Sequence, residues 1–109
     1  MVKILLGRDD VDPDKSDNHG GTPLSGAALN GHGGVVKMLL ERDDVNPDKS
    51  DNDGGTPLLW ATYNGHEGVV NRLLERDNVN PDKSDNEGRT PLLWAAYNGH
   101  ERMVKILLV

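Results

Sequence analysis

The sequence predicts an all-α repeat solenoid, a row of short helical units that stack against one another. Three motifs recur every 34 residues in the chain of 109: Thr-Pro-Leu begins at 22, 56 and 90, Asn-Gly-His at 30, 64 and 98, and Pro-Asp-Lys-Ser-Asp-Asn at 13, 47 and 81. A fixed period of this length is typical of solenoids, because so small a unit buries its apolar side only against its neighbours. We expect one domain, 1–109, with a partial second helix at 1–8 and repeats at about 9–42, 43–76 and 77–109.

Each unit is expected to open with a projecting turn, as the middle one illustrates. Asn46 precedes Pro47, which favours extended backbone, and the string Asp-Asn-Asp-Gly at 51–54 is rich in turn-forming residues. Segment 43–55 is therefore predicted to be a turn or short hairpin that protrudes from the helices, and is called a finger below.

Two short helices follow each finger. Thr56 supplies an N-cap hydroxyl and Pro57 suits the first helical position, while Asn64-Gly65 provides the left-handed residue that ends a helix. A second helix opens at His66 and carries an apolar face of Val69, Val70, Leu73 and Leu74. The first helices also hold small residues that allow close stacking of neighbouring units: Ala27, Ala28, Ala61, Ala95 and Ala96.

The acidic residues are concentrated in the fingers. The net charge is −6, and 16 of the 18 Asp and Glu residues lie at 7–20, 41–54 and 75–88. Such a surface repels phosphate backbones and attracts basic groups, so we expect a protein partner of basic character and no nucleic acid. The chain has no cysteine, no long apolar run and no signal peptide, which favours a cytoplasmic protein without membrane contact.

The residues from Thr90 to His100, Thr-Pro-Leu-Leu-Trp-Ala-Ala-Tyr-Asn-Gly-His, followed by Met-Val-Lys-Ile-Leu-Leu at 103–108, resemble the ankyrin repeat. The resemblance covers the whole chain. The repeats are similar to a 34-residue variant of the family that is found in recently duplicated fungal arrays. It implies antiparallel helix pairs with fingers at about a right angle, and binding to other proteins. Where the family usually has a histidine bonded to the threonine, this chain has Ser25, Leu59 and Leu93, so that network is expected to be lost or replaced by packing.

The family's partner contacts come from the finger tips and the exposed side of the first helices. Carried over by position, the resemblance places the helix contacts at Leu29, Tyr63 and Tyr97. It places the tip contacts at His19, Asp53 and Glu87, together with Gly21, Gly55 and Arg89.

Aromatic residues strengthen the case for the helix face. Trp60 with Tyr63, and Trp94 with Tyr97, are three residues apart and share a face, so stacked units line them into an aromatic strip that ends at Gly26 and Leu29. Large aromatics are favoured interface anchors. The tyrosines are expected to be partly exposed, while burial of the tryptophans between units remains an open alternative to contact with a partner.

No residue pattern favours catalysis, a cofactor or a metal. The string around Asp51 and Asp53 echoes a calcium loop, but the first and last ligand positions would be Lys49 and Trp60. The repeated histidines His32, His66 and His100 are a full unit apart, too far to share one ion, and are expected at helix starts. We therefore expect a non-enzymatic protein-binding module.

Both ends of the chain are apolar, at 1–6 and 106–109, where a solenoid normally has a polar cap. Two explanations are compatible. The chain is a piece of a longer array, natural or engineered, or it is a structural repeat whose bare ends associate with those of other copies.

Overall fold

Three helix pairs follow one another along the chain. In the computed structural model, which describes residues 11–109, this part of the chain forms six helices and no strand. They are α2 (Pro23–Leu29), α3 (Gly33–Leu40), α4 (Pro57–Tyr63), α5 (Glu67–Leu74), α6 (Pro91–Tyr97) and α7 (Glu101–Leu108). The predicted all-α solenoid of stacked antiparallel helix pairs is confirmed. The partial helix expected at 1–8 lies outside the described residues.

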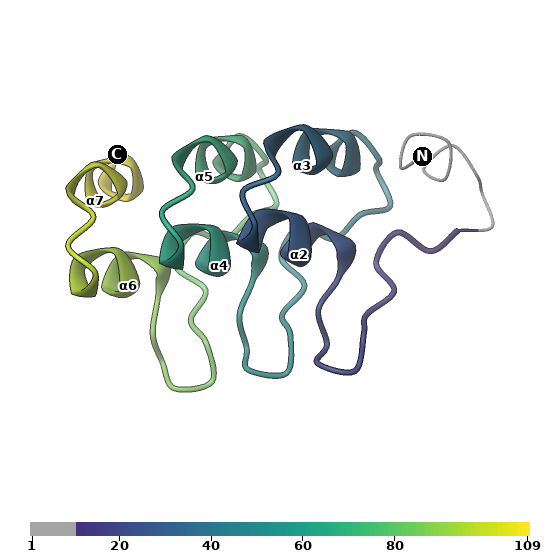
Figure 1. The fold of residues 1–109 in the computed structure, drawn as a ribbon, viewed down its shortest axis with the longest axis horizontal. Helices are drawn as coiled ribbons and strands as arrows, with labels where there is room; N and C mark the ends of the chain where they lie inside the picture. The colour runs from purple at the N-terminus through teal and green to yellow at the C-terminus, as the bar shows by residue number, and fades with distance from the viewer. Residues whose placement is uncertain (1–10) are drawn as a thin grey trace.

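The helices form two rows. Figure 1 shows α2, α4 and α6 side by side in one row and α3, α5 and α7 in the other, with the fingers extending from the first row away from the second. Helix α4 packs between α2 and α6, and α3 packs against α5. We call each finger with the helix pair after it a repeat, so that the fingers at 11–21, 43–55 and 77–89 belong to the first, second and third repeats. The result is an elongated body of 41 × 25 × 22 Å.

The first helix of each repeat begins and ends as its sequence predicts. Thr56 caps α4, its side-chain oxygen accepting a hydrogen bond from the backbone nitrogen of Leu59 at 3.2 Å, and Pro57 follows at the first helical position. Asn64 ends the helix and Gly65 then takes a positive φ of 75°. The second helix α5 starts after His66, whose side chain makes no capping bond.

Packing between repeats, rather than intrinsic helix stability, holds these elements in place, because isolated helices of 7 or 8 residues are marginal in water. The core contains aliphatic residues from both rows of helices. The first helices contribute Leu24 and Leu58, and the second helices contribute Val36, Val70 and Leu73. Burial of one such side chain contributes roughly 1.5–3 kcal/mol. Four of the five small residues predicted to allow close stacking are buried, namely Ala27, Ala28, Ala61 and Ala95, while Ala96 is exposed on the outer side of the third repeat.

The three positions that replace the family's histidine behave differently from one another. Ser25 keeps a bond to the threonine, because Thr22 and Ser25 cap each other's backbone nitrogens in a capping box. Leu59 is 1% exposed, whereas Leu93 is 50% exposed. The expected replacement by packing therefore holds in the second repeat, and the first retains a polar link.

Each finger is a tight turn closed by its own backbone. In the second, the nitrogen of Asp51 donates to the carbonyl of Gly55 at 2.9 Å, and that of Gly54 donates to the carbonyl of Asp51 at 3.0 Å. Neighbouring fingers are joined as well, since the nitrogen of Asn52 donates to the carbonyl of His19 at 2.9 Å. The side-chain nitrogen of Asn52 also donates to Asn18, at 3.1 Å. The same pair of bonds recurs one repeat later.

The string Pro-Asp-Lys-Ser-Asp-Asn, identical in the three repeats, supplies contacts between repeats. Asp14 accepts a hydrogen bond from the backbone nitrogen of Asn46 at 2.7 Å, and the ammonium of Lys49 donates to the carbonyl of Asp14 at 3.0 Å. The same contacts join the second and third fingers: the backbone nitrogen of Asn80 donates to the carboxylate of Asp48 at 2.7 Å, and the ammonium of Lys83 donates to the carbonyl of Asp48 at 2.9 Å. These bonds fix the spacing of the fingers and thereby the surface they border.

Candidate binding surface

The exposed sides of α2, α4 and α6, together with the sides of the fingers that adjoin them, form a surface that we call the inner face. Four aromatic rings lie in an unbroken series along it. The ring centroids of Trp60 and Tyr63 are 5.9 Å apart, those of Tyr63 and Trp94 are 4.9 Å apart, and those of Trp94 and Tyr97 are 5.9 Å apart, each pair meeting edge to face. The aromatic strip predicted from the spacing is thus present, and Tyr63 joins two repeats.

The two tyrosines of this strip are open to solvent, as is the leucine at the corresponding position of the first repeat. Tyr97 is 80% exposed, Tyr63 is 40% exposed and Leu29, which occupies the same position in the first repeat, is 37% exposed. The partial exposure expected for the tyrosines is confirmed. Trp60 and Trp94 are half-buried, and they lie against the fingers instead of being enclosed between helices.

Trp60 is held by the finger of its own repeat. Its indole nitrogen donates to Oδ2 of Asp51 at 2.7 Å, while Oδ1 of Asp51 accepts from the backbone nitrogens of Asp53 and Gly55. Gly55, expected at an accessible finger tip, is buried, because the indole lies where a Cβ atom would stand. A side chain at position 55 would therefore collide with the indole of Trp60 where it stands.

Arg89 replaces this glycine in the third repeat and changes the local chemistry. Its Nε lies 2.9 Å from Oδ2 of Asp85, a second guanidinium nitrogen lies 3.1 Å from Glu87, and the guanidinium carbon is 4.6 Å from the centre of the Trp94 ring. Arg89 is therefore half-buried near the base of the finger and already paired within the chain.

The charges of this cluster support one another. Burial raises the pKa of Asp85, but the hydrogen bonds from Arg89, Glu87 and Trp94 together outweigh it and leave that pKa below its ordinary value. The hydrogen bond to Asp85 in turn raises the pKa of Arg89. The pair is consequently ionised in the folded protein.

The finger tips carry the other predicted contact residues. His19, Asp53 and Glu87 are exposed and occupy corresponding positions in the three fingers. The backbone carbonyls of His19 and Asp53 bind the next finger, while their side chains remain at the surface. The three side chains therefore lie at the surface, at the same position of successive fingers.

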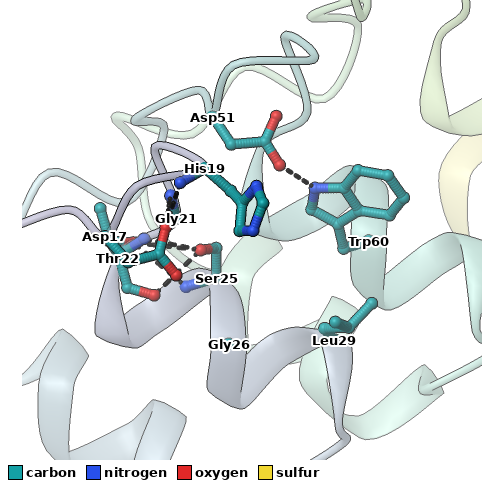
Figure 2. Close-up of a pocket in the computed structure, with 9 residues that line it drawn as sticks. All are labelled: Asp17, His19, Gly21, Thr22, Ser25, Gly26, Leu29, Asp51 and Trp60. Atoms are coloured by element: carbon teal, nitrogen blue, oxygen red, sulfur yellow. Dashed lines mark hydrogen bonds between the residues drawn. The ribbon is translucent and has the colours of Figure 1, made fainter.

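A hollow of about 230 Å³ lies where the first finger meets α2 (Figure 2). Asp17, Gly21 and Gly26 line it from the first repeat, and Asp51 and Trp60 line it from the second. Figure 2 shows the ring of His19 between the Asp17 side of the hollow and Trp60. Asp17 was not predicted as a contact residue. The sequence contains a signal for the hollow beside it, because Gly26 stands where the later repeats have Trp60 and Trp94.

The repeated histidines, considered above as metal ligands, stand at helix starts. Residues 11–109 contain no group of three His, Asp or Glu side chains placed to hold a metal ion. His66 and His100 stand at helix starts, as expected, and Nε2 of His66 lies 3.0 Å from the carbonyl of Leu29. None of the helices in this part of the chain has the length and apolar character needed to cross a membrane.

The comparison with protein families identifies the architecture. A family model described as ankyrin repeats (3 copies) matches residues 44–109, and a model of the single ankyrin repeat matches residues 19–52. The chain belongs to the ankyrin-repeat family. No curated protein matches it. Ankyrin repeats generally mediate interactions between proteins and are typically non-enzymatic, so the inner face of this ankyrin domain is its candidate binding surface.

Proposed function

We propose that this ankyrin domain binds another protein through its inner face. The observation that carries the proposal is the aromatic strip of Trp60, Tyr63, Trp94 and Tyr97, which runs across two repeats with its tyrosines exposed. Large amphipathic aromatics on a rigid support are favoured anchors at protein interfaces, because they bury much apolar area while losing little conformational entropy. Leu29 extends the same surface into the first repeat.

The fingers determine which partners suit this surface. They hold most of the acidic residues of a chain with a net charge of −6, and the tips present Asp53 and Glu87 beside the strip. A surface of this sign accelerates the approach of basic segments and repels nucleic acids. We therefore propose a basic protein partner whose apolar side chains contact the strip and whose cationic groups face the fingers.

The absence of cysteine supports a cytoplasmic location for the protein. Fractionation of cells that express the tagged chain tests this location.

Selection of binding peptides from a displayed random library tests the proposal. Selected peptides are expected to be rich in Arg and Lys and to lose at least tenfold in affinity for a Tyr63→Ala/Tyr97→Ala variant, since each change removes an anchoring ring. Asn71→Ala is the matched control, because Asn71 is exposed on α5, in the other row of helices. Equal binding to the double variant and the wild type would show that the ligands contact a different surface.

A second candidate function is association between copies of the chain. In the second repeat Leu59 is 1% exposed, whereas the corresponding Leu93 in the third is 50% exposed and Leu108 is 66% exposed. An apolar face of this kind suits the face of another repeat. Sedimentation velocity over a wide range of concentrations should then show association that Leu93→Asp weakens, and a monomer at all concentrations would remove this candidate.

A further inference from the structure

We infer that the hollow beside Gly26 binds the guanidinium group of an arginine side chain in a partner protein. The inference rests on the proposed function and names the chemistry of one contact. Gly26 stands 34 residues before Trp60 and 68 before Trp94, and a Cβ atom at this position would have no neighbour within 4 Å. The first repeat therefore lacks the planar side chain that the later repeats place here.

The missing side chain leaves an acceptor unused. Oδ1 of Asp17 accepts hydrogen bonds from the backbone nitrogens of His19 and Gly21, both at 2.9 Å, as its counterparts do in the later fingers. The other oxygen of each counterpart binds a side-chain donor: Trp60 in the case of Asp51, and Arg89 with Trp94 in the case of Asp85. Within the described residues, Oδ2 of Asp17 has no such donor. The hydrogen bonds from the backbone nitrogens of Gly21 and His19 lower the pKa of Asp17, which favours the ionised carboxylate.

The third repeat shows the type of group that fits such an acceptor. The guanidinium of Arg89 binds Oδ2 of the corresponding Asp85 at 2.9 Å and lies over the ring of Trp94. In the first repeat the position of Arg89 is occupied by Gly21, so no arginine stands at this position of the first finger. Figure 2 shows Asp17 on one side of the hollow and Trp60, from the second repeat, on the other, with the ring of His19 between them. A guanidinium that enters from outside therefore meets Asp17 and Trp60 only where the exposed side chain of His19 turns aside.

Arginine suits this hollow better than other donors do. An indole is planar, but it carries no charge to match the carboxylates of Asp17 and Asp51, which both line the hollow. An ammonium carries the charge, but it is a compact group that cannot lie as a plate along an aromatic ring while donating to a carboxylate. A guanidinium does both, and the combination of ion pair and stacking on an aromatic ring is favourable.

Nuclear magnetic resonance of the full chain tests the inference, because the indole N–H groups of Trp60 and Trp94 give separate signals. We expect an acetylated and amidated Gly-Arg-Gly peptide to shift the signals of Trp60 and the backbone amides of Gly21 and Gly26. Trp94, with Arg89 already in place, serves as the internal control. Matched peptides with Lys or Trp in the middle should shift them several times less at the same concentration. No shift at Trp60 and Gly26, equal shifts at Trp94, or equal effects of the Lys peptide would overturn the inference.

Two variants localise the site. Gly26→Trp gives the first repeat the residue of the later ones and fills the hollow, so the shifts caused by the arginine peptide should disappear while the circular dichroism of the helices is unchanged. Asp17→Asn keeps the oxygen that caps the finger but removes the charge, and should weaken binding at least fivefold even if Gly26→Trp fails to fold. Undiminished binding by either folded variant would contradict the site.

The outcomes separate this inference from the proposed function. Loss of peptide shifts in Gly26→Trp tests the hollow, whereas the Tyr63→Ala/Tyr97→Ala variant tests the strip. If library-selected ligands depend on the tyrosines but the arginine peptide does not bind, the inference fails alone. If the arginine peptide binds at Gly26 but no ligand depends on the tyrosines, the proposed use of the strip fails alone.

Discussion

The indole nitrogen of Trp60 lies 2.7 Å from Oδ2 of Asp51, which ties α4 to the finger of its own repeat. The corresponding distance from Trp94 to Asp85 is 3.4 Å, because Arg89 donates to the same oxygen. The last residue of the finger is Gly55 in the second repeat and Arg89 in the third. This residue therefore decides whether the tryptophan or a guanidinium is the main donor to the carboxylate of the finger.

Replacement of Trp60 by phenylalanine should lower the free energy of unfolding by roughly 1.5–3 kcal/mol, since a six-membered aromatic ring stays but the hydrogen bond of the indole to a charged acceptor is lost. Trp94→Phe is the matched control and should cost less, because Arg89 still neutralises Asp85. Urea denaturation followed by far-ultraviolet circular dichroism measures both. Equal losses would mean that the indole bond contributes nothing beyond packing.

Replacement of Gly54 by alanine should destabilise the protein more than replacement of Gly88. Both glycines have φ near 80°, so each alanine incurs roughly 1–2 kcal/mol of backbone strain. A Cβ atom at Gly54 would also come within 2.6 Å of the backbone nitrogen of Asn86, whereas a Cβ atom at Gly88 would have no neighbouring atom within 4 Å. Thermal unfolding of the two variants should differ by several degrees, and identical midpoints would show that the contact between fingers is unimportant.

Replacement of Lys49 by methionine tests the bonds between repeats. Methionine keeps most of the side-chain length but cannot donate to the carbonyl of Asp14, so we expect a loss of about 0.5–1.5 kcal/mol. Lys15→Met is the control, since Lys15 is exposed and should tolerate the change within about 0.5 kcal/mol. A similar effect of both variants in chemical denaturation would indicate a general charge effect instead.

Stability should fall in acid, through the finger carboxylates. Backbone hydrogen bonds lower the pKa of Asp17 from its ordinary value of 3.8, and the hydrogen bonds of Asp85 leave its pKa below the same value. A carboxylate with a lowered folded-state pKa contributes fully above the pKa of the unfolded chain, and the contribution is lost as the pH falls through the folded value. The free energy of unfolding should therefore be constant from about pH 6 to 5 and decline below pH 4. In the Asp85→Asn variant the decline should be shallower, and a wild-type curve that is flat down to pH 2.5 would contradict the assignment.

Local features of the fold could be predicted from the sequence because they depend on neighbouring residues. The cap at Thr56 and the helix end at Gly65 follow from side-chain reach and backbone freedom within a few residues. The series of rings from Trp60 to Tyr97 follows from helical spacing combined with the constant period. The prediction of these features did not require the distance between repeats to be known.

The contacts that span repeats could not be predicted in the same way. The bond from Lys49 to Asp14 joins residues 35 apart, and its existence depends on the distance between stacked fingers. The burial of Gly55 depends on the orientation of Trp60, which the spacing does not determine. The hollow at Gly26 likewise required the position of Trp60 relative to the first finger.

The fingers bind each other at the tips through the backbone carbonyls of His19 and Asp53 and through the side chains of Asn52 and Asn86. Within the described residues, the side chains of positions 19, 53 and 87 form none of these bonds between fingers, and His, Asp and Glu already stand there in turn. Random variation of positions 19, 53 and 87 would generate a large family of differently decorated molecules on an unaltered framework. Such a domain can acquire new recognition properties by mutation without first having to regain its ability to fold.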